Sequence, residues 1–297
     1  MQTIQAKVIA DSMSPQRVRL TTLQLTYPRF IHAEVMTHRV FSRNASSSRA
    51  IPVAKMIEQV RTNMAKPVHW GKNQPGMQAR EELSGAERQS VERLWVDAAF
   101  EAARIAEAMA KHGAHKQVVN RILEPFQWMH TVVTATEWNN FFELRAHPDA
   151  QPEIHELALA MQDAFEASVP VIMRHGQWHL PYVRSEEMRR GGAIFEWTRA
   201  QEGDAFIERH VLRTAVRCST ARCARVSFLR HDGLTPLVEE DQGLYVRLVG
   251  SKPIHASPTE HQAMAVMGMG DAAWWSGNLR GWMQHRKMLE RGEEVGA

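Results

Sequence analysis

The residues best suited to chemistry lie between Thr37 and Arg49, in the segment THRVFSRNASSSR. These 13 residues include three arginines, one histidine, one asparagine and four serines. Arginine donates paired hydrogen bonds to phosphate, and serine hydroxyls and backbone N–H groups can serve the remaining oxygens. The segment is too polar to form a core, so it predicts either a phosphate-binding turn or a solvated basic turn. Taken alone, the pattern slightly favours the solvated turn.

Regular elements must hold this segment in place. Alternation over residues 3–10 and a second apolar run over 17–27 predict two strands before it. The second run changes phase, which indicates a bulge or a strand buried on both faces. Residues 30–40 fit either a helix or a buried strand. Pro52 is placed as the first residue of a helix that reaches about Met64.

The helix with the clearest pattern follows a loop over residues 66–83. Ser84 and Glu87 predict a capping box at its start, and Gly113 predicts its end. Its expected inward stripe is Val91, Leu94, Trp95, Ala98, Ala102, Ile105 and Met109.

Three more helices are expected downstream. Thr134 and Glu137 predict a capping box that begins a helix which Pro148 stops. Further helices are predicted over residues 152–174, with Val169 facing inward, and from about 204 to 221.

Composition limits the class of protein. With 297 residues and 44% hydrophobic content, the chain can bury a sizeable core, while a net charge of +3 is too small to predict a stable nucleic-acid complex. Two cysteines, no signal-peptide pattern and no apolar run of about 20 residues predict a cytoplasmic protein without a membrane span. Histidine spacing favours structural histidines, so no metal is expected.

We therefore predict one domain over residues 1–297 with an α/β (α+β) fold. Helices should dominate it and pack on a small, mostly antiparallel sheet. Residues 266–297, a tail with several tryptophans, have no role that the sequence assigns.

The polar segment resembles the signature of the flavin-dependent thymidylate synthases, R-H-R-x-x-S-x-N-x-x-S-x-R. Six of its seven fixed positions match in register: His38, Arg39, Ser42, Asn44, Ser47 and Arg49. Downstream, RILEP at 121–125 resembles the R-x-x-L-P element of that family. NFFELR at 140–145, followed by AQ and EI at 150–154, resembles its N-F-L-x-L-R…A-Q-x-E-I helix.

Two more elements match in an unexpected order. ARVSF at 224–228 resembles A-R-V-S-[YF], and HASPTEH at 255–261 resembles H-x-[ST]-P-F-E-H. In the family they precede the signature, and here they follow it. The chain looks circularly permuted, which is geometrically reasonable if its two ends lie close together.

The resemblance implies a role for each matched residue. FAD contacts are implied for His38, Arg39, Asn140, Ser227, Ser257 and Glu260. Contacts to a dUMP-like pyrimidine nucleotide are implied for Glu34, Ser47, Ser48, Arg49, Arg121 and Arg145. Arg145, facing the uracil ring, and His255, near the flavin face, are implied as catalytic. NADPH and methylenetetrahydrofolate are implied as co-substrates and a homotetramer as the assembly.

Several positions depart from the family. Thr37 replaces the first arginine of the signature, Ala45 replaces a glutamate, and Glu34 replaces a glutamine. A carboxylate beside a nucleotide phosphate is repulsive unless it is turned away or paired. Two other cofactor-side positions are occupied by Thr134 and Thr136.

These departures leave other functions open. One is a related enzyme that methylates or hydroxymethylates another pyrimidine nucleotide. A second is a non-catalytic module that binds phosphate or nucleic acid, and a weaker third is a metal hydrolase.

Overall fold

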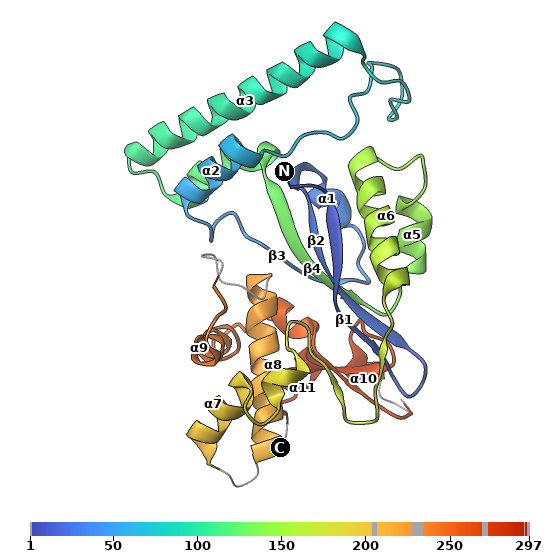
Figure 1. Cartoon of the computed structure of the whole chain (residues 1–297), viewed down its shortest axis with the longest axis vertical. Coiled ribbons are helices and arrows are strands. Elements are labelled where there is room, and N and C mark those ends of the chain that lie inside the picture. The colour runs from blue at the N-terminus through green and yellow to red at the C-terminus, as the bar shows by residue number, and fades with distance from the viewer. Residues whose placement is uncertain (1, 204–206, 227–233, 269–272, 294, 296–297) are drawn as a thin grey trace.

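A computed structural model describes residues 2–203, 207–226, 234–268, 273–293 and 295 (Figure 1). Its main sheet has the strand order β3-β4-β2-β1-β5. The strands are β1 (Gln5–Met13), β2 (Arg19–Pro28), β3 (Ser42–Ala45), β4 (Trp128–Ala135) and β5 (Val171–Ile172). All neighbours are antiparallel except β1 and β5, which confirms the mostly antiparallel sheet. The register shifts between Val8 and Ala10, so the irregularity lies in β1 and not in the second strand.

The two faces of this sheet differ in chemistry. Leu23, Leu25 and Tyr27 of β2 face an apolar core that α5 (Asn139–Arg145) and α6 (Pro152–Ala167) cover (Figure 1). The opposite face carries Thr22 and Gln24, whose partners come from the C-terminal part of the chain. Alternation in β2 therefore separates an apolar layer from a polar one.

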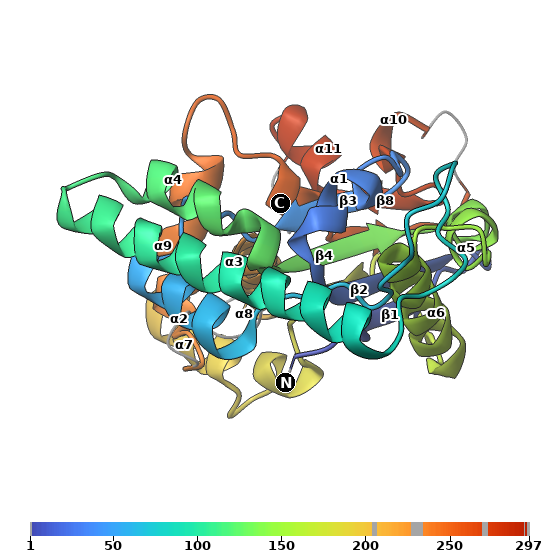
Figure 2. The same cartoon turned by 90° about the horizontal axis from the view of Figure 1, so that it is seen from above.

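A second, smaller core lies at one end of the molecule. It is built from α2 (Val53–Asn63), α3 (Gly85–Lys111), α4 (Lys116–Val119) and η2 (Asn120–Phe126), with α2 and α4 beside α3 (Figure 2). Helices α2 and α3 were expected, α4 and η2 were not, and the stripe on α3 is only partly as predicted. Ala99, Ala103 and Ala106 are fully buried, whereas Leu94 is 66% and Ile105 40% exposed. Trp95, Ala102 and Met109 of the predicted stripe do pack against this core, but the fully buried positions are alanines, whose small side chains allow close packing.

The C-terminal part contributes helices and a three-stranded sheet. Its helices are η3 (Ser185–Met188), α7 (Ala193–Glu202), α8 (Ile207–Arg225), α9 (Val238–Val249), η4 (Ser257–Glu260), α10 (Ala273–Ser276) and α11 (His285–Glu290). The sheet has the order β6 (Trp178–His179), β7 (Ala263–Ala265), β8 (Trp282–Gln284). Trp282 of the tail is completely buried in a cluster with Leu20 of β2.

Several local predictions were wrong. Residues 30–40 form neither a long helix nor a strand, but two short turns, η1 (Arg29–Ile31) and α1 (His32–Val35). The Ser84 side chain makes no capping bond to α3. The helix predicted over 152–174 ends at Ala167, because residues 171–172 pair with β1, and Val169 is 87% exposed.

Thr134 also lies where no helix begins. It is a strand residue of β4, and its hydroxyl contacts Thr22 and His261, so it cannot cap α5, which starts at Asn139. Figure 1 places the two chain ends far apart along the long axis, contrary to the proximity that would favour permutation. No helix in the described ranges is long and apolar enough to cross a membrane.

A buried chain of hydrogen bonds crosses the polar face of the main sheet. Ser12 contacts His179 Nδ1 at 2.9 Å, and Thr22 contacts His179 Nε2 at 2.8 Å. Thr22 also contacts Thr134 at 2.7 Å, and Thr134 contacts His261 Nδ1 at 2.8 Å. Burial lowers the pKa of both His179 and His261 to about 3, so both rings are neutral near pH 7.

Stability should therefore fall in mild acid. Burial also lowers the pKa of His285 to about 3, so between roughly pH 6.5 and 3 these three histidines take up protons only in the unfolded chain. Each one then lowers the unfolding free energy by up to about 1.4 kcal/mol per pH unit. Urea unfolding between about pH 7 and pH 5 measures this slope.

His285→Phe should make that slope shallower, since it removes one titrating ring from the interior. His112→Gln, at an exposed position, should leave it unchanged. A stability that stays flat over this range contradicts the prediction.

A second buried polar group ties η3, α8 and α9 together. Arg222, whose side chain is 1% exposed, bonds Glu187 and, at 2.9 Å, Asp241. It also donates to the backbone oxygen of Tyr182 at 2.8 Å. Asp241 accepts from Arg225 as well. These groups compensate one another in a region that excludes water.

Arg222→Met should destabilise the protein by about 3–5 kcal/mol, because it leaves two buried carboxylates without this cation. The unfolding free energy in urea measures the loss. The exposed pair of Arg61 and Glu107 provides a control, and Glu107→Gln should give no resolvable change. An equal effect of both substitutions argues against a special role for the buried cluster.

Candidate active site

The polar segment Thr37–Arg49 forms a turn after α1 and then enters β3. Arg43 holds the turn by donating from Nη1 to the backbone oxygens of Met36, at 2.6 Å, and His38, at 2.9 Å. The structure gives Arg43 a backbone-bracing role within the segment.

Four residues predicted or noted from the sequence meet beside this turn. Arg145 Nε donates to His38 Nε2 at 3.1 Å, and Arg145 Nη2 lies 3.4 Å from Thr37 Oγ1. Arg145 Nη1 lies 3.6 Å from a carboxylate oxygen of Glu34. The carboxylate that seemed repulsive in the sequence is therefore paired. Arg145 is the last residue of α5, whose packing on the main core fixes its backbone.

The environment of His38 makes its imidazole a neutral acceptor. His38 is 8% exposed, and its ring meets Phe141 edge to face, with ring centroids 4.7 Å apart. Burial, together with the charges of Arg145 and Arg43, lowers the pKa of His38 to about 4. Because Nε2 accepts from Arg145, the ring hydrogen is assigned to Nδ1.

The predicted phosphate residues gather around a carboxylate that the sequence reading passed over. Glu124 Oε1 accepts from Ser48 Oγ at 2.9 Å and from Arg121 Nη1 at 2.9 Å. It also lies 2.8 Å from Arg29 Nη2. Ser47 and Arg49 are exposed on the adjoining turn. Glu124 could have been noticed, since it stands where the R-x-x-L-P element has leucine.

Asn44 joins three of the matched sequence elements. Its Nδ2 donates to the backbone oxygens of Cys223, at 2.8 Å, and Ala224, at 3.2 Å. Its Oδ1 accepts from Ser257 Oγ at 3.0 Å. Ala224 and Ser257, which belong to the two late sequence elements, thus lie against the signature segment.

The remaining predicted residues differ in their engagement. Glu260 is paired with Arg286, and its backbone oxygen accepts from Gln284 at 3.1 Å. Arg39, Asn140 and His255 are exposed, and no side-chain hydrogen bond joins them to another described residue. Ser227 lies outside the described residues.

Both cysteines are poor nucleophiles. Cys218 and Cys223 are fully buried and free. Burial raises the pKa of Cys218 to about 12, and the pKa of Cys223 is raised further for the same reason. Burial therefore disfavours the thiolate form of both residues.

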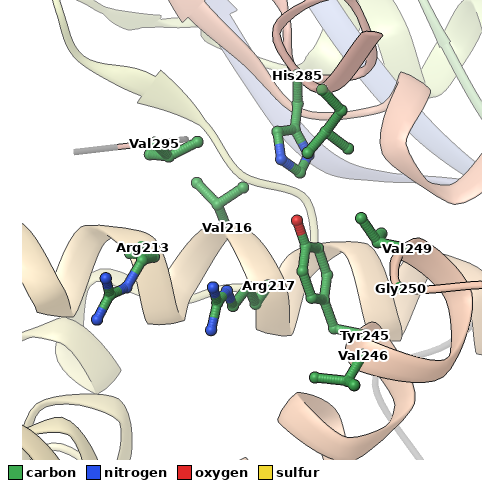
Figure 3. A pocket seen from close by; sticks show the side chains of 10 residues that line it. Arg213, Val216, Arg217, Tyr245, Val246, Val249, Gly250, His285 and Val295 are labelled. Atoms are coloured by element: carbon green, nitrogen blue, oxygen red, sulfur yellow. The ribbon is translucent and has the colours of Figure 1, made fainter. Parts of the chain in front are cut away.

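A separate cavity of about 210 Å³ lies between α8, α9 and α11 (Figure 3). Arg213, Arg217, Tyr245 and His285 give it a polar, cationic part. Arg213 is paired with Glu202 at 2.6 Å. None of the described residues that the sequence assigned to the site lines this cavity.

Comparison with known proteins identifies the class of the chain. The sequence model of a family described as thymidylate synthase complementing protein matches residues 4–171. This range is more than half of the 297 residues and includes Glu34, the signature segment and Arg145. The chain belongs to this family. A search of curated proteins finds no match.

Two of the similar solved structures are complexes of a UMP/dUMP methylase, PolB, from Streptomyces cacaoi. The complex with 5-Br UMP has 18% identity and a TM-score of 0.45, and covers 56% of this chain and 89% of the other. The complex with 5-Br dUMP has 16% identity and a TM-score of 0.45, with 56% and 90% covered.

Arg145→Gln should raise the pKa of His38, because it removes one of the two cations that disfavour protonation of the ring. The pKa should stay below its ordinary value of about 6.5, since burial, the larger cause, remains. NMR titration of the imidazole, assigned with His38→Asn, measures the shift. Arg93→Gln, at an exposed position, is the matched control, and equal titration in both variants contradicts the assignment.

Proposed function

We propose that this protein is a flavin-dependent thymidylate synthase that methylates dUMP to dTMP. Methylenetetrahydrofolate would donate the carbon and NADPH would be the reductant. Family membership supports the coarser statement, a methyltransferase-type enzyme that acts on a pyrimidine nucleotide. The finer statement rests on the site residues.

The contact of Arg145 with His38, Thr37 and Glu34 carries the proposal. A half-buried guanidinium held by a packed helix suits a pyrimidine ring, whose carbonyl edge gains negative charge during reaction. Glu34 limits the freedom of that guanidinium, and the neutral His38 accepts from it without competing for the anion. Arg145 would thus orient the ring and stabilise its charge.

FAD, which the family implies, needs donors for its pyrophosphate. Arg39 and Asn140 fit this need because both are exposed, and neither side chain is hydrogen-bonded to another described residue. His38, Ser257 and Glu260 are engaged within the protein and would act by shaping the site. Bound flavin would supply hydride chemistry, so no protein nucleophile is required. The buried cysteines agree with this division of roles.

The nucleotide would meet Ser47, Ser48, Arg49 and Arg121, and His255 would lie on the cofactor side. A homotetramer is part of the proposal because the family resemblance implies that assembly.

The test is product formation. The full-length protein is incubated anaerobically with FAD, NADPH, dUMP and methylenetetrahydrofolate, and the nucleotide is identified by mass spectrometry. We expect dTMP, with at least about a hundredfold lower rate in Arg145→Gln because charge stabilisation at the ring is lost. Arg93→Gln should retain the wild-type rate.

Other outcomes separate the alternatives. Turnover only with another pyrimidine nucleotide, or a hydroxymethylated product, supports the related enzyme and attributes the change to Glu34, Thr37 and Ala45. Absence of both product and flavin binding contradicts the proposal. Steeply salt-dependent binding to random DNA would then support a binding module.

A further inference from the structure

The carboxylate of Glu124 stands at the centre of the proposed phosphate cradle. One oxygen, Oε1, takes a hydroxyl from Ser48 and cationic donors from Arg121 and Arg29. A hydroxyl and two guanidinium groups that converge on one point are what a phosphate oxygen requires. The carboxylate of Glu124 thus occupies the position where a phosphate oxygen would bind.

The groups around Glu124 are fixed in place. The carboxylate side chain is 22% exposed and that of Arg29 is 18% exposed. Ser48 is 5% exposed, and Asn120 Nδ2 holds its backbone by donating to the oxygens of Ser48, at 2.7 Å, and Ile51, at 3.0 Å. This brace fixes the backbone of Ser48 beside Glu124.

An incoming phosphate meets this charge directly. Its dianion would share Arg29 and Arg121 with a carboxylate, and like charges in a partly buried site repel each other. Exposed Arg49 and the half-exposed Arg121 still attract the phosphate. The phosphate can therefore bind, but it adds little to the binding free energy. A 5′-hydroxyl carries no charge and suffers no such repulsion.

We propose that Glu124 sets the substrate class of this site. The site accepts pyrimidine nucleosides without a 5′-phosphate about as well as their 5′-monophosphates. This inference rests on the proposed function, because it takes Ser48 and Arg121 as the phosphate side of the pyrimidine site.

Binding of deoxyuridine and dUMP to the full-length protein, measured by calorimetry at one ionic strength, tests the inference. For the wild type, the two dissociation constants should lie within about tenfold of each other. Glu124→Gln retains an acceptor oxygen for Ser48 and removes the charge. This variant should lower the dissociation constant of dUMP by at least about tenfold and leave that of deoxyuridine unchanged.

Glu58→Gln is the matched control, since Glu58 is exposed and has no ion-pair partner in the described part of the chain. It removes the same charge from the molecule and should change neither constant. Thermal unfolding of each variant verifies that the fold is retained at the assay temperature.

Two results would overturn the inference while leaving the proposed function intact. One is wild-type protein that binds dUMP more than about a hundredfold tighter than deoxyuridine. The other is a Glu124→Gln variant that binds dUMP no better or more weakly, which would make Glu124 a positioning residue for the arginines. Failure of wild type and variant to bind either ligand overturns the proposed function, and this inference with it.

Discussion

The carboxamide of Asn44 is the interaction on which the site depends. Its three hydrogen bonds connect β3 to the end of α8 and to η4, segments about 180 and 213 residues away in the chain. An amide is suited to this task because it donates and accepts at once without charge. If Asn44 were lost, the oxygens of Cys223 and Ala224 would lose this side-chain donor, and the signature segment would lose its hydrogen bonds to both distant segments.

Paired charges shape the rest of the site. Glu34 faces Arg145, Glu124 faces Arg29 and Arg121, and Glu260 faces Arg286. Each carboxylate restrains a flexible guanidinium, so the arginines are held in place before a ligand binds. The same carboxylates reduce the positive electrostatic potential of the site. The net charge of +3 does not show that the arginines of the site are paired with carboxylates. A site rich in arginine can thus be only weakly attractive to anions.

Sequence patterns predicted the features that depend on neighbouring residues in the chain. The strands over residues 5–13 and 19–28 and the helix over residues 85–111 follow from periodicity and spacing. The same patterns did not predict features that depend on residues far away in the chain. Thr134 was predicted to cap a helix because Glu137 lies three residues later. Instead, Thr134 pairs with β2 as part of a strand, and its hydroxyl is hydrogen-bonded to His261. Glu124 went unnoticed because its partners Arg29 and Ser48 lie far from it in the chain. On α3 the predicted stripe was right for Trp95 and Met109, which pack against the core, and wrong for Leu94 and Ile105, which are exposed.

The polar face of the main sheet has a consequence for how this chain can evolve. Thr22 and Thr134 lie inside the family match over residues 4–171, while their partners His179 and His261 lie beyond it. The hydroxyls and rings are all fully buried, so a change on one side alone removes a buried hydrogen bond from the other. The two parts of the gene cannot be exchanged freely with those of a relative that lacks these histidines. Among homologues, these four positions should be inherited together, and recombination between the halves should be rare.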